Sequence, residues 1–223
     1  MTPLAVRSGV VPSRIPRRVE STALEVDRIE RALDGARGAL RREHAGMARE
    51  LPAPSAEAAL PDTATLFRRY SRYVAAIGIR ILGRQDEIED YIQDVFMGVH
   101  RSVGSLRDPG ALKGWIAKLA VHEATRRLKR RKVRAFFGLG ITPEYEGVAD
   151  ASASPEDRAL LAHVFAALDR LPAHERVAWS LRHLEGETME SVAALCSCSL
   201  STAKRRVAQA EQALEKLGVG RDG

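Results

Sequence analysis

Residues 171–211 read LPAHERVAWSLRHLEGETMESVAALCSCSLSTAKRRVAQAE, and this stretch decides the fold of the C-terminal part of the chain. Pro172 opens a predicted helix, and Gly186 ends it. A short helix is predicted from Met189 to Leu195, and a longer basic helix begins after an N-cap at Ser199. A short helix, a three-residue turn and a longer basic helix form the helix-turn-helix arrangement, which is typical of proteins that read DNA.

The turn between these helices holds both cysteines of the chain, Cys196 and Cys198. A zinc site, an oxidisable switch and apolar packing are the alternatives for such a pair. The chain has no second cysteine pair, and His163, His174 and His183 lack the close spacing of zinc ligands. Because free cysteine packs as a small hydrophobe, we expect both side chains to lie against the core, with no metal and no cofactor.

Helical spacing of apolar residues also appears earlier in the chain. Apolar side chains recur every three or four positions after Thr63, and Gly83 marks a stop. Asp86 is the predicted N-cap of the next helix, with Glu89 three residues further on. A third helix follows the loop SLRDPG, because Pro109 suits the first helical position. No alternating strand pattern appears in the sequence, so the predicted fold class is all-α.

Two small helical domains and two irregular segments follow from this pattern. Residues 62–134 are predicted to form a helical bundle, and residues 154–218 a helix-turn-helix domain. Residues 135–153 carry acids but no Lys or Arg and lack a helical period, so we interpret them as a flexible acidic linker. Residues 1–61 are interpreted as a flexible extension, within which Met47 is an alternative start.

Charge is distributed unevenly along the chain. The formal net charge is +6 over 223 residues, which favours an anionic partner, most often nucleic acid. Basic residues gather between Arg126 and Arg134 without interleaved acids, and acidic residues gather between Asp86 and Asp94. These clusters indicate separate contact surfaces, although a solvated helix face is the alternative for each.

Two further classes of protein are disfavoured by what the sequence lacks. No apolar run approaches the ~20 residues that cross a bilayer, and the N-terminus has no signal-peptide core, so we expect a cytoplasmic protein without a membrane span. The chain contains no Gly-rich phosphate loop, no HExxH and no Gly-x-Ser-x-Gly. Catalysis therefore has little support.

Three stretches in order resemble the extracytoplasmic-function group of bacterial RNA polymerase sigma factors, over roughly residues 62–217. DEIEDYIQDVF (86–96) is similar to the signature of region two, and GWIAKLAVHEATRRLKRR (114–131) to the helix that melts the promoter and reads its minus-ten element. Residues 171–211 resemble region four, which reads the minus-thirty-five element.

The resemblance implies a promoter-specificity subunit that has no catalytic site. It would bind core RNA polymerase, place it at promoter DNA and help to open the duplex, and an anti-sigma factor is a further partner to consider. A stand-alone helix-turn-helix regulator is the alternative function, and an enzyme is a more distant one.

The resemblance also implies three sets of contact residues. Asp90, Gln93 and Asp94 match positions that grip the clamp helices of the largest polymerase subunit. The positions expected at minus-ten DNA are Ser105, Arg107, Trp115, Lys118, His122, Arg126, Arg127 and Arg130. Those expected in the major groove of the minus-thirty-five element are Ser199, Ser201, Thr202, Lys204, Arg205 and Gln209.

Several positions depart from the family pattern. His122 stands where the family often has Asn, and Arg126 where it often has Asp, which bears on the minus-ten base preference. Ser197 replaces the usual glycine of the turn. Gln209 and Glu211 replace positions that are commonly basic, so we expect region four to hold DNA phosphates more weakly than usual.

Overall fold

The structure is a computed structural model, and it describes residues 62–139 and 155–217. All regular elements in these two stretches are helices, which confirms the all-α prediction. No helix within them is long and apolar enough to cross a membrane. The expectations for residues 1–61 and for most of the linker at 135–153 lie outside the described residues.

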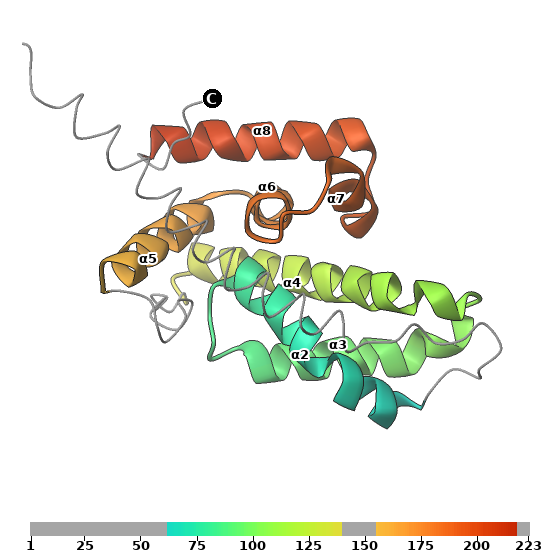
Figure 1. Ribbon diagram of the computed structural model, residues 1–223. Coiled ribbons are helices and arrows are strands. Elements are labelled where there is room, and N and C mark those ends of the chain that lie inside the picture. Colours follow the sequence, from blue (N-terminus) through green and yellow to red (C-terminus); the bar gives the residue numbers. More distant parts are fainter. Residues whose placement is uncertain (1–61, 140–154, 218–223) are drawn as a thin grey trace, which may run out of the picture.

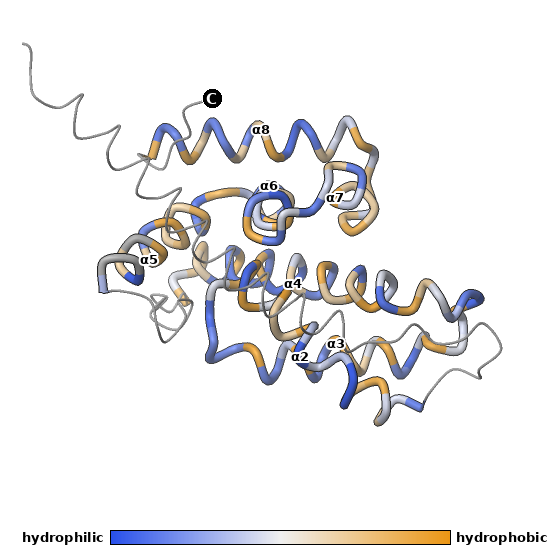
Figure 2. Tube along the Cα trace, viewed as in Figure 1, coloured by the Kyte–Doolittle hydropathy of each residue, from blue (hydrophilic) through white to orange (hydrophobic). Residues whose placement is uncertain are grey.

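Three long helices build the N-terminal part of the structure. They are α2 (Thr63–Leu82), α3 (Ile88–Ser102) and α4 (Leu112–Phe136), and two 3-10 turns, η1 (Val103–Ser105) and η2 (Pro109–Ala111), join α3 to α4. Figure 1 shows α2 and α3 lying along one side of α4, and each of the three helices contacts the other two. Hydrophobic and hydrophilic residues alternate along each helix in Figure 2, as expected for amphipathic helices around a shared core.

The ends of α2 follow the sequence prediction, but the start of α3 does not. The Asp62 side chain accepts a hydrogen bond from the Thr65 amide at 2.8 Å, and Gly83 ends α2 with a φ of 66°. The predicted N-cap at Asp86 is wrong, since α3 starts at Ile88 without a side-chain cap. The Asp86 carboxylate instead accepts a hydrogen bond from Arg84 Nε at 2.9 Å, and a charged donor attracts it more strongly than a backbone amide does.

The C-terminal part contains α5 (Pro155–Arg170), α6 (Ala173–Trp179), η4 (Ser180–Leu184), α7 (Met189–Leu195) and α8 (Leu200–Lys216). Pro172 precedes α6 and Met189–Leu195 is a helix, as the sequence predicts. The sequence predicted one helix from Pro172 to Gly186. In the structure this helix is α-helical only as far as Trp179, and its last turn, η4, is a π-helix.

The short helices α6 and α7 lie between the long helices α4 and α8 (Figure 1), and each short helix contacts both long ones. Val177, Leu181 and Val192 belong to the same buried cluster as Ile116 and Ala120 of α4. The two segments that the sequence divides into separate domains are therefore packed together across a continuous apolar core. The sequence did not predict this contact.

The turn between α7 and α8 holds the backbone of Ser197 in the left-handed region, with a φ of 50°. Ser197 is the one non-glycine residue with positive φ in the described stretches. This explains why a glycine is usual at this position, since only glycine adopts such a φ at no steric cost.

Substituting glycine at this turn is expected to stabilise the protein. Ser197→Gly should raise the free energy of unfolding by about 1 kcal/mol, because the left-handed strain of an L-residue disappears. Gln209→Gly, at an exposed position in the middle of α8, should lower it by about 1 kcal/mol, because glycine weakens a helix interior. Urea denaturation followed by circular dichroism measures both. A lower stability of Ser197→Gly would contradict this account of the turn.

Candidate nucleic-acid and partner interface

The exposed side of α3 carries the residues predicted to bind polymerase. Asp90 and Gln93 are exposed, and Asp94 is half-buried. Asp94 Oδ2 accepts a hydrogen bond from Arg127 Nη2 of α4 at 2.6 Å. The structure therefore brings Asp90 and Gln93 to the surface but directs Asp94 towards α4.

Beside Gln93 lies an apolar groove of about 520 Å³ between α2 and α3. Two large hydrophobic side chains on its rim are unusually exposed: Phe67 of α2 at 44% and Met97 of α3 at 52%. Exposed apolar patches of this kind mark interaction sites. The sequence analysis missed both residues, although each follows a core residue directly and so extends the apolar stripe beyond the buried face.

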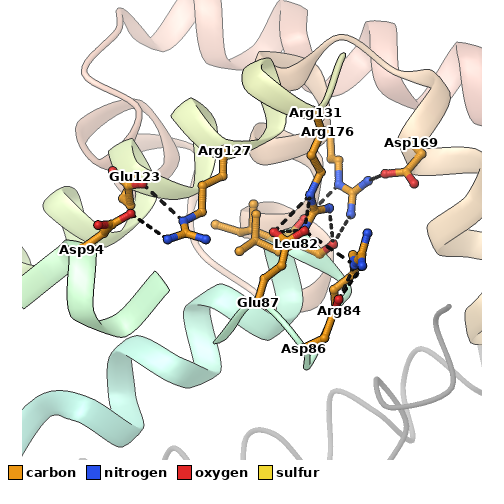
Figure 3. Close-up of polar contacts among 11 residues, drawn as sticks. Leu82, Arg84, Asp86, Glu87, Asp94, Glu123, Arg127, Arg131, Asp169 and Arg176 are labelled. Atoms are coloured by element: carbon orange, nitrogen blue, oxygen red, sulfur yellow. Dashed lines mark hydrogen bonds and ion pairs between the residues drawn. The ribbon is translucent and has the colours of Figure 1, made fainter. Parts of the chain in front are cut away.

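The basic run at the end of α4 is divided between internal contacts and the surface. Arg127 pairs with Asp94 and with Glu123, and Arg131 donates to Glu87 at 2.6 Å (Figure 3). Acids from α3, from the turn before it and from an earlier turn of α4 offset part of this run. The basic side chains that are exposed in this run are Arg126, Lys129, Arg130, Lys132 and Arg134.

The residues predicted to contact minus-ten DNA extend from the η1–η2 loop to the middle of α4. Ser105, Arg107 and Lys118 are exposed, and Trp115 is half-buried against the core. Arg126 and Arg130 are exposed too, and Arg126 Nε donates to Glu123 Oε2 at 2.7 Å. The loop residues and Lys118 thus present their side chains to solvent.

His122 is exposed, and its ring contacts the C-terminal part of the chain. Its Nε2 lies 3.0 Å from Ser197 Oγ of the helix-turn-helix turn. Burial, and then the charge of Lys118, lower the pKa of His122 from its ordinary value. The structure therefore joins a predicted minus-ten residue to the turn that precedes the predicted recognition helix.

One face of α8 carries the residues predicted for the major groove. Ser201, Lys204, Arg205 and Gln209 are exposed and recur at helical spacing, which places them on one side of the helix. The opposite side buries Ala203, Val207, Ala210 and Leu214. Ser199 caps the helix, since its Oγ accepts a hydrogen bond from the Thr202 amide at 3.2 Å. The hydroxyl of the half-buried Thr202 also lies within hydrogen-bond distance of this Oγ, at 2.8 Å.

Both cysteines are half-buried and pack beside the apolar core, in line with the hydrophobic interpretation of the turn. Burial raises the pKa of the Cys196 thiol to about 11. The thiol is therefore protonated near neutral pH, where a thiolate would be the reactive form.

Two family models match this chain in order. The model for Sigma-70 region 2 covers residues 66–134, and that for Sigma-70, region 4 covers residues 164–214. Among curated relatives, the ECF RNA polymerase sigma factor SigE of Mycolicibacterium smegmatis is 30% identical over 165 residues, which cover 71% of this chain and 62% of that relative. The ECF RNA polymerase sigma-E factor of Escherichia coli K12 is 27% identical over 159 residues, which cover 66% of this chain and 81% of that relative.

Among solved structures, the sigma factor RpoE from Bartonella quintana, in complex with the anti-sigma factor NepR, aligns with a TM-score of 0.53 at 25% identity. The alignment covers 71% of this chain and 97% of that one. The chain belongs to the sigma-70 family, in its extracytoplasmic-function group. The comparisons support a promoter-recognising sigma factor over a stand-alone helix-turn-helix regulator.

Proposed function

We propose that this chain binds core RNA polymerase in the cytoplasm, recognises the minus-ten and minus-thirty-five elements of a promoter and promotes DNA opening, with no catalytic site of its own. The observation that carries the proposal is the order of the two sigma regions on one chain, region two at residues 66–134 and region four at residues 164–214. Since the solved relative RpoE is bound to an anti-sigma factor, we include such a protein as a further partner.

Each surface has a role in this proposal. The exposed face of α8 enters the major groove, where Lys204 and Arg205 supply donors for base edges and phosphates. The loop residue Arg107 and Lys118 of α4, both exposed, contact the unpaired minus-ten strand. Asp90 and Gln93 of α3, with the apolar groove beside them, form the polymerase contact. Asp94 supports this surface through Arg127 rather than by direct contact.

The direct test is transcription with purified components. Core polymerase is mixed with the full chain and genomic fragments, and the 5′ ends of the transcripts are mapped. We expect initiation at discrete sites that depend on the added protein. Initiation at the same sites without the protein, or none with it, would refute the proposed function.

Reversing the charge of Asp90 should weaken binding to core polymerase. Asp90→Lys places a cation where the proposed partner surface is basic, and we expect at least a tenfold lower affinity in a titration with core polymerase. Helicity should stay within error, because exposed substitutions usually change stability by less than ~0.5 kcal/mol. Glu215→Lys, an equal charge change at an exposed position of α8, is the control. Normal affinity of Asp90→Lys would remove this residue from the interface.

A further inference from the structure

The C-terminal end of α4 exposes four large apolar side chains to solvent. Phe136 is 86% exposed, Leu139 72%, Phe137 69% and Val133 57%, and no other large hydrophobic side chain in the described stretches is as exposed. Val133 precedes Phe136 and Phe137 by three and four residues, so these three side chains share one face of the helix. We call the four residues the apolar tip. Exposed apolar patches of this kind mark interaction sites.

A hydrogen-bonded cap holds the apolar tip in place. Gly138 has a φ of 71°, in the left-handed region. Its amide donates to the Ala135 carbonyl at 3.1 Å, and the Leu139 amide donates to the Arg134 carbonyl at 3.0 Å. These two bonds form a Schellman motif, which satisfies carbonyl groups that a helix end otherwise leaves without partners. The end of α4 can therefore enter an apolar layer with few unpaired backbone groups.

Basic side chains surround the apolar tip. Arg130 and Arg134, four residues apart, lie along one edge of the face formed by residues 133–137, and Lys132 lies along the other edge. Lys129 lies one turn before Val133 on the same face. All four basic residues are exposed, and none of them forms an ion pair with another residue in the described stretches. No Asp or Glu occurs from residue 124 to residue 139.

An apolar tip within a basic ring has the chemistry to bind the surface of an anionic lipid bilayer. Acyl chains receive Phe, Val and Leu side chains without any hydrogen bond, and head-group phosphates attract Lys and Arg. Stable attachment to a bilayer surface needs two signals, for example an inserted apolar group and a polybasic patch. The end of α4 carries both.

Nucleic acid is the competing partner for a basic surface that carries aromatic rings, and it fits the tip less well. The rings of Phe136 and Phe137 meet edge to face, with their centroids 5.5 Å apart and their planes at 85°. A platform for bases needs open ring faces, whereas here one ring is directed at the other. Val133 and Leu139 offer a base neither a stacking face nor a hydrogen bond.

We propose that the end of α4 is a lipid-binding surface that attaches the protein to an anionic membrane. The apolar tip enters the acyl region, and the four basic side chains contact the head-group phosphates. Neither sigma-region model covers residues 135–139, so most of the tip lies outside the parts of the chain that match the family. Arg130 is also expected at minus-ten DNA, so lipid and promoter would compete for it, a consequence that rests on the proposed function.

Co-sedimentation of the full chain with vesicles tests the proposal without polymerase or DNA. One set of vesicles contains phosphatidylcholine alone, and the other contains about one third phosphatidylglycerol. The parent should bind the anionic vesicles about tenfold more tightly or more than the neutral ones. This preference should shrink as salt is added, because salt screens exposed charges.

Removing the aromatic pair should weaken attachment. Phe136→Ser combined with Phe137→Ser should lower the affinity for anionic vesicles by about tenfold or more, because the apolar area that leaves water is lost. Helicity should stay within error, since both positions are exposed. Leu200→Ser, at an exposed apolar position of α8, is the control and should bind like the parent.

Removing two charges of the basic ring should act on anionic vesicles only. Lys132→Gln combined with Arg134→Gln should lower the affinity for them by about thirtyfold and leave the weak binding to neutral vesicles unchanged. Arg72→Gln combined with Lys216→Gln removes two exposed charges elsewhere, on α2 and α8, and should change the affinity by less than about twofold.

Insertion of the tip is measured with Phe137→Trp, because the native Trp115 is half-buried and Trp179 is buried. Lipids brominated on their acyl chains should quench the emission of this variant well beyond that of the parent. Equal binding of the parent to both kinds of vesicle, normal vesicle binding after loss of the aromatic pair, or no added quenching would each overturn the proposal. If the aromatic variant binds vesicles normally but loses affinity for a single-stranded oligonucleotide, the tip is a platform for bases instead.

Discussion

Arg176→Met is expected to lower the free energy of unfolding by about 3 kcal/mol, the loss typical when one partner of a buried charged network is removed. Methionine retains the apolar stem but removes the donors that reach the carbonyls of Ile81 and Leu82 at 2.8 and 2.9 Å. The Leu82 carbonyl keeps its hydrogen bond from Arg131 Nη1 at 3.0 Å. Asp169 loses its ion pair in the same step. Burial lowers the pKa of Arg176 to about 10, which the charge of Asp169 opposes, so the guanidinium remains protonated at pH 7.

Urea denaturation followed by circular dichroism measures the effect of Arg176→Met. Arg182→Met is the matched control, because Arg182 is exposed and donates to the Glu187 carbonyl within region four. It should change stability by less than ~0.5 kcal/mol. Arg176→Lys should recover only part of the loss, since a lysine cannot serve three acceptors in the fixed geometry of a guanidinium. If Arg176→Met matches the control, Arg176 does not hold the regions together.

The double change Lys204→Ala and Arg205→Ala is expected to lower transcription from a promoter with a minus-thirty-five element by roughly thirtyfold or more. Each base or phosphate contact contributes about 1–3 kcal/mol, and both side chains lie exposed on the outward face of α8. The opposite face of α8 carries its packing, so folding should be unchanged. The binding constant for DNA should also depend less steeply on salt concentration, by the amount expected when about two phosphate contacts are lost.

Two controls separate promoter reading from other effects of that double change. Lys216→Ala, at an exposed position in the last turn of α8, should transcribe like the parent. A pre-melted template without the minus-thirty-five element should be transcribed equally by the double variant and the parent. An equal loss on this template would contradict a role confined to the upstream element.

Local signals in the sequence predicted most helix boundaries. The capping oxygen of Ser199 and the left-handed Gly83 act within a few residues of the chain, so they can be recognised without tertiary contacts. The exposed face of α8 followed from helical spacing in the same way. Asp86 was wrongly predicted to cap α3. Its carboxylate accepts from Arg84, two residues away, and sequence spacing does not tell whether this ion pair or a hydrogen bond from a backbone amide is preferred.

Contacts between distant residues were beyond sequence reasoning. Arg127 finds Asp94 across 33 positions, and Arg176 finds the Ile81 carbonyl across 95. Arg127 looked available for DNA in the sequence, because a charge run does not reveal which of its members face the protein, and the role of Arg176 was not predicted at all. The site residues taken from the family resemblance therefore remain predictions, and the structure shows which of them are exposed.

The π-helical turn η4 makes the inter-region contact sensitive to a one-residue change in length. The Glu185 amide bonds to the Ser180 carbonyl at 3.1 Å, five residues back, so this turn accommodates one residue more than an α-helical turn would. Deleting one residue from 180–184 would restore α-helical geometry and rotate Glu185 by about 100°, away from Arg80, with which it forms a buried ion pair. Evolution can thus retune the pairing of the two regions by an insertion or deletion here, while the sequence of the recognition helix stays the same.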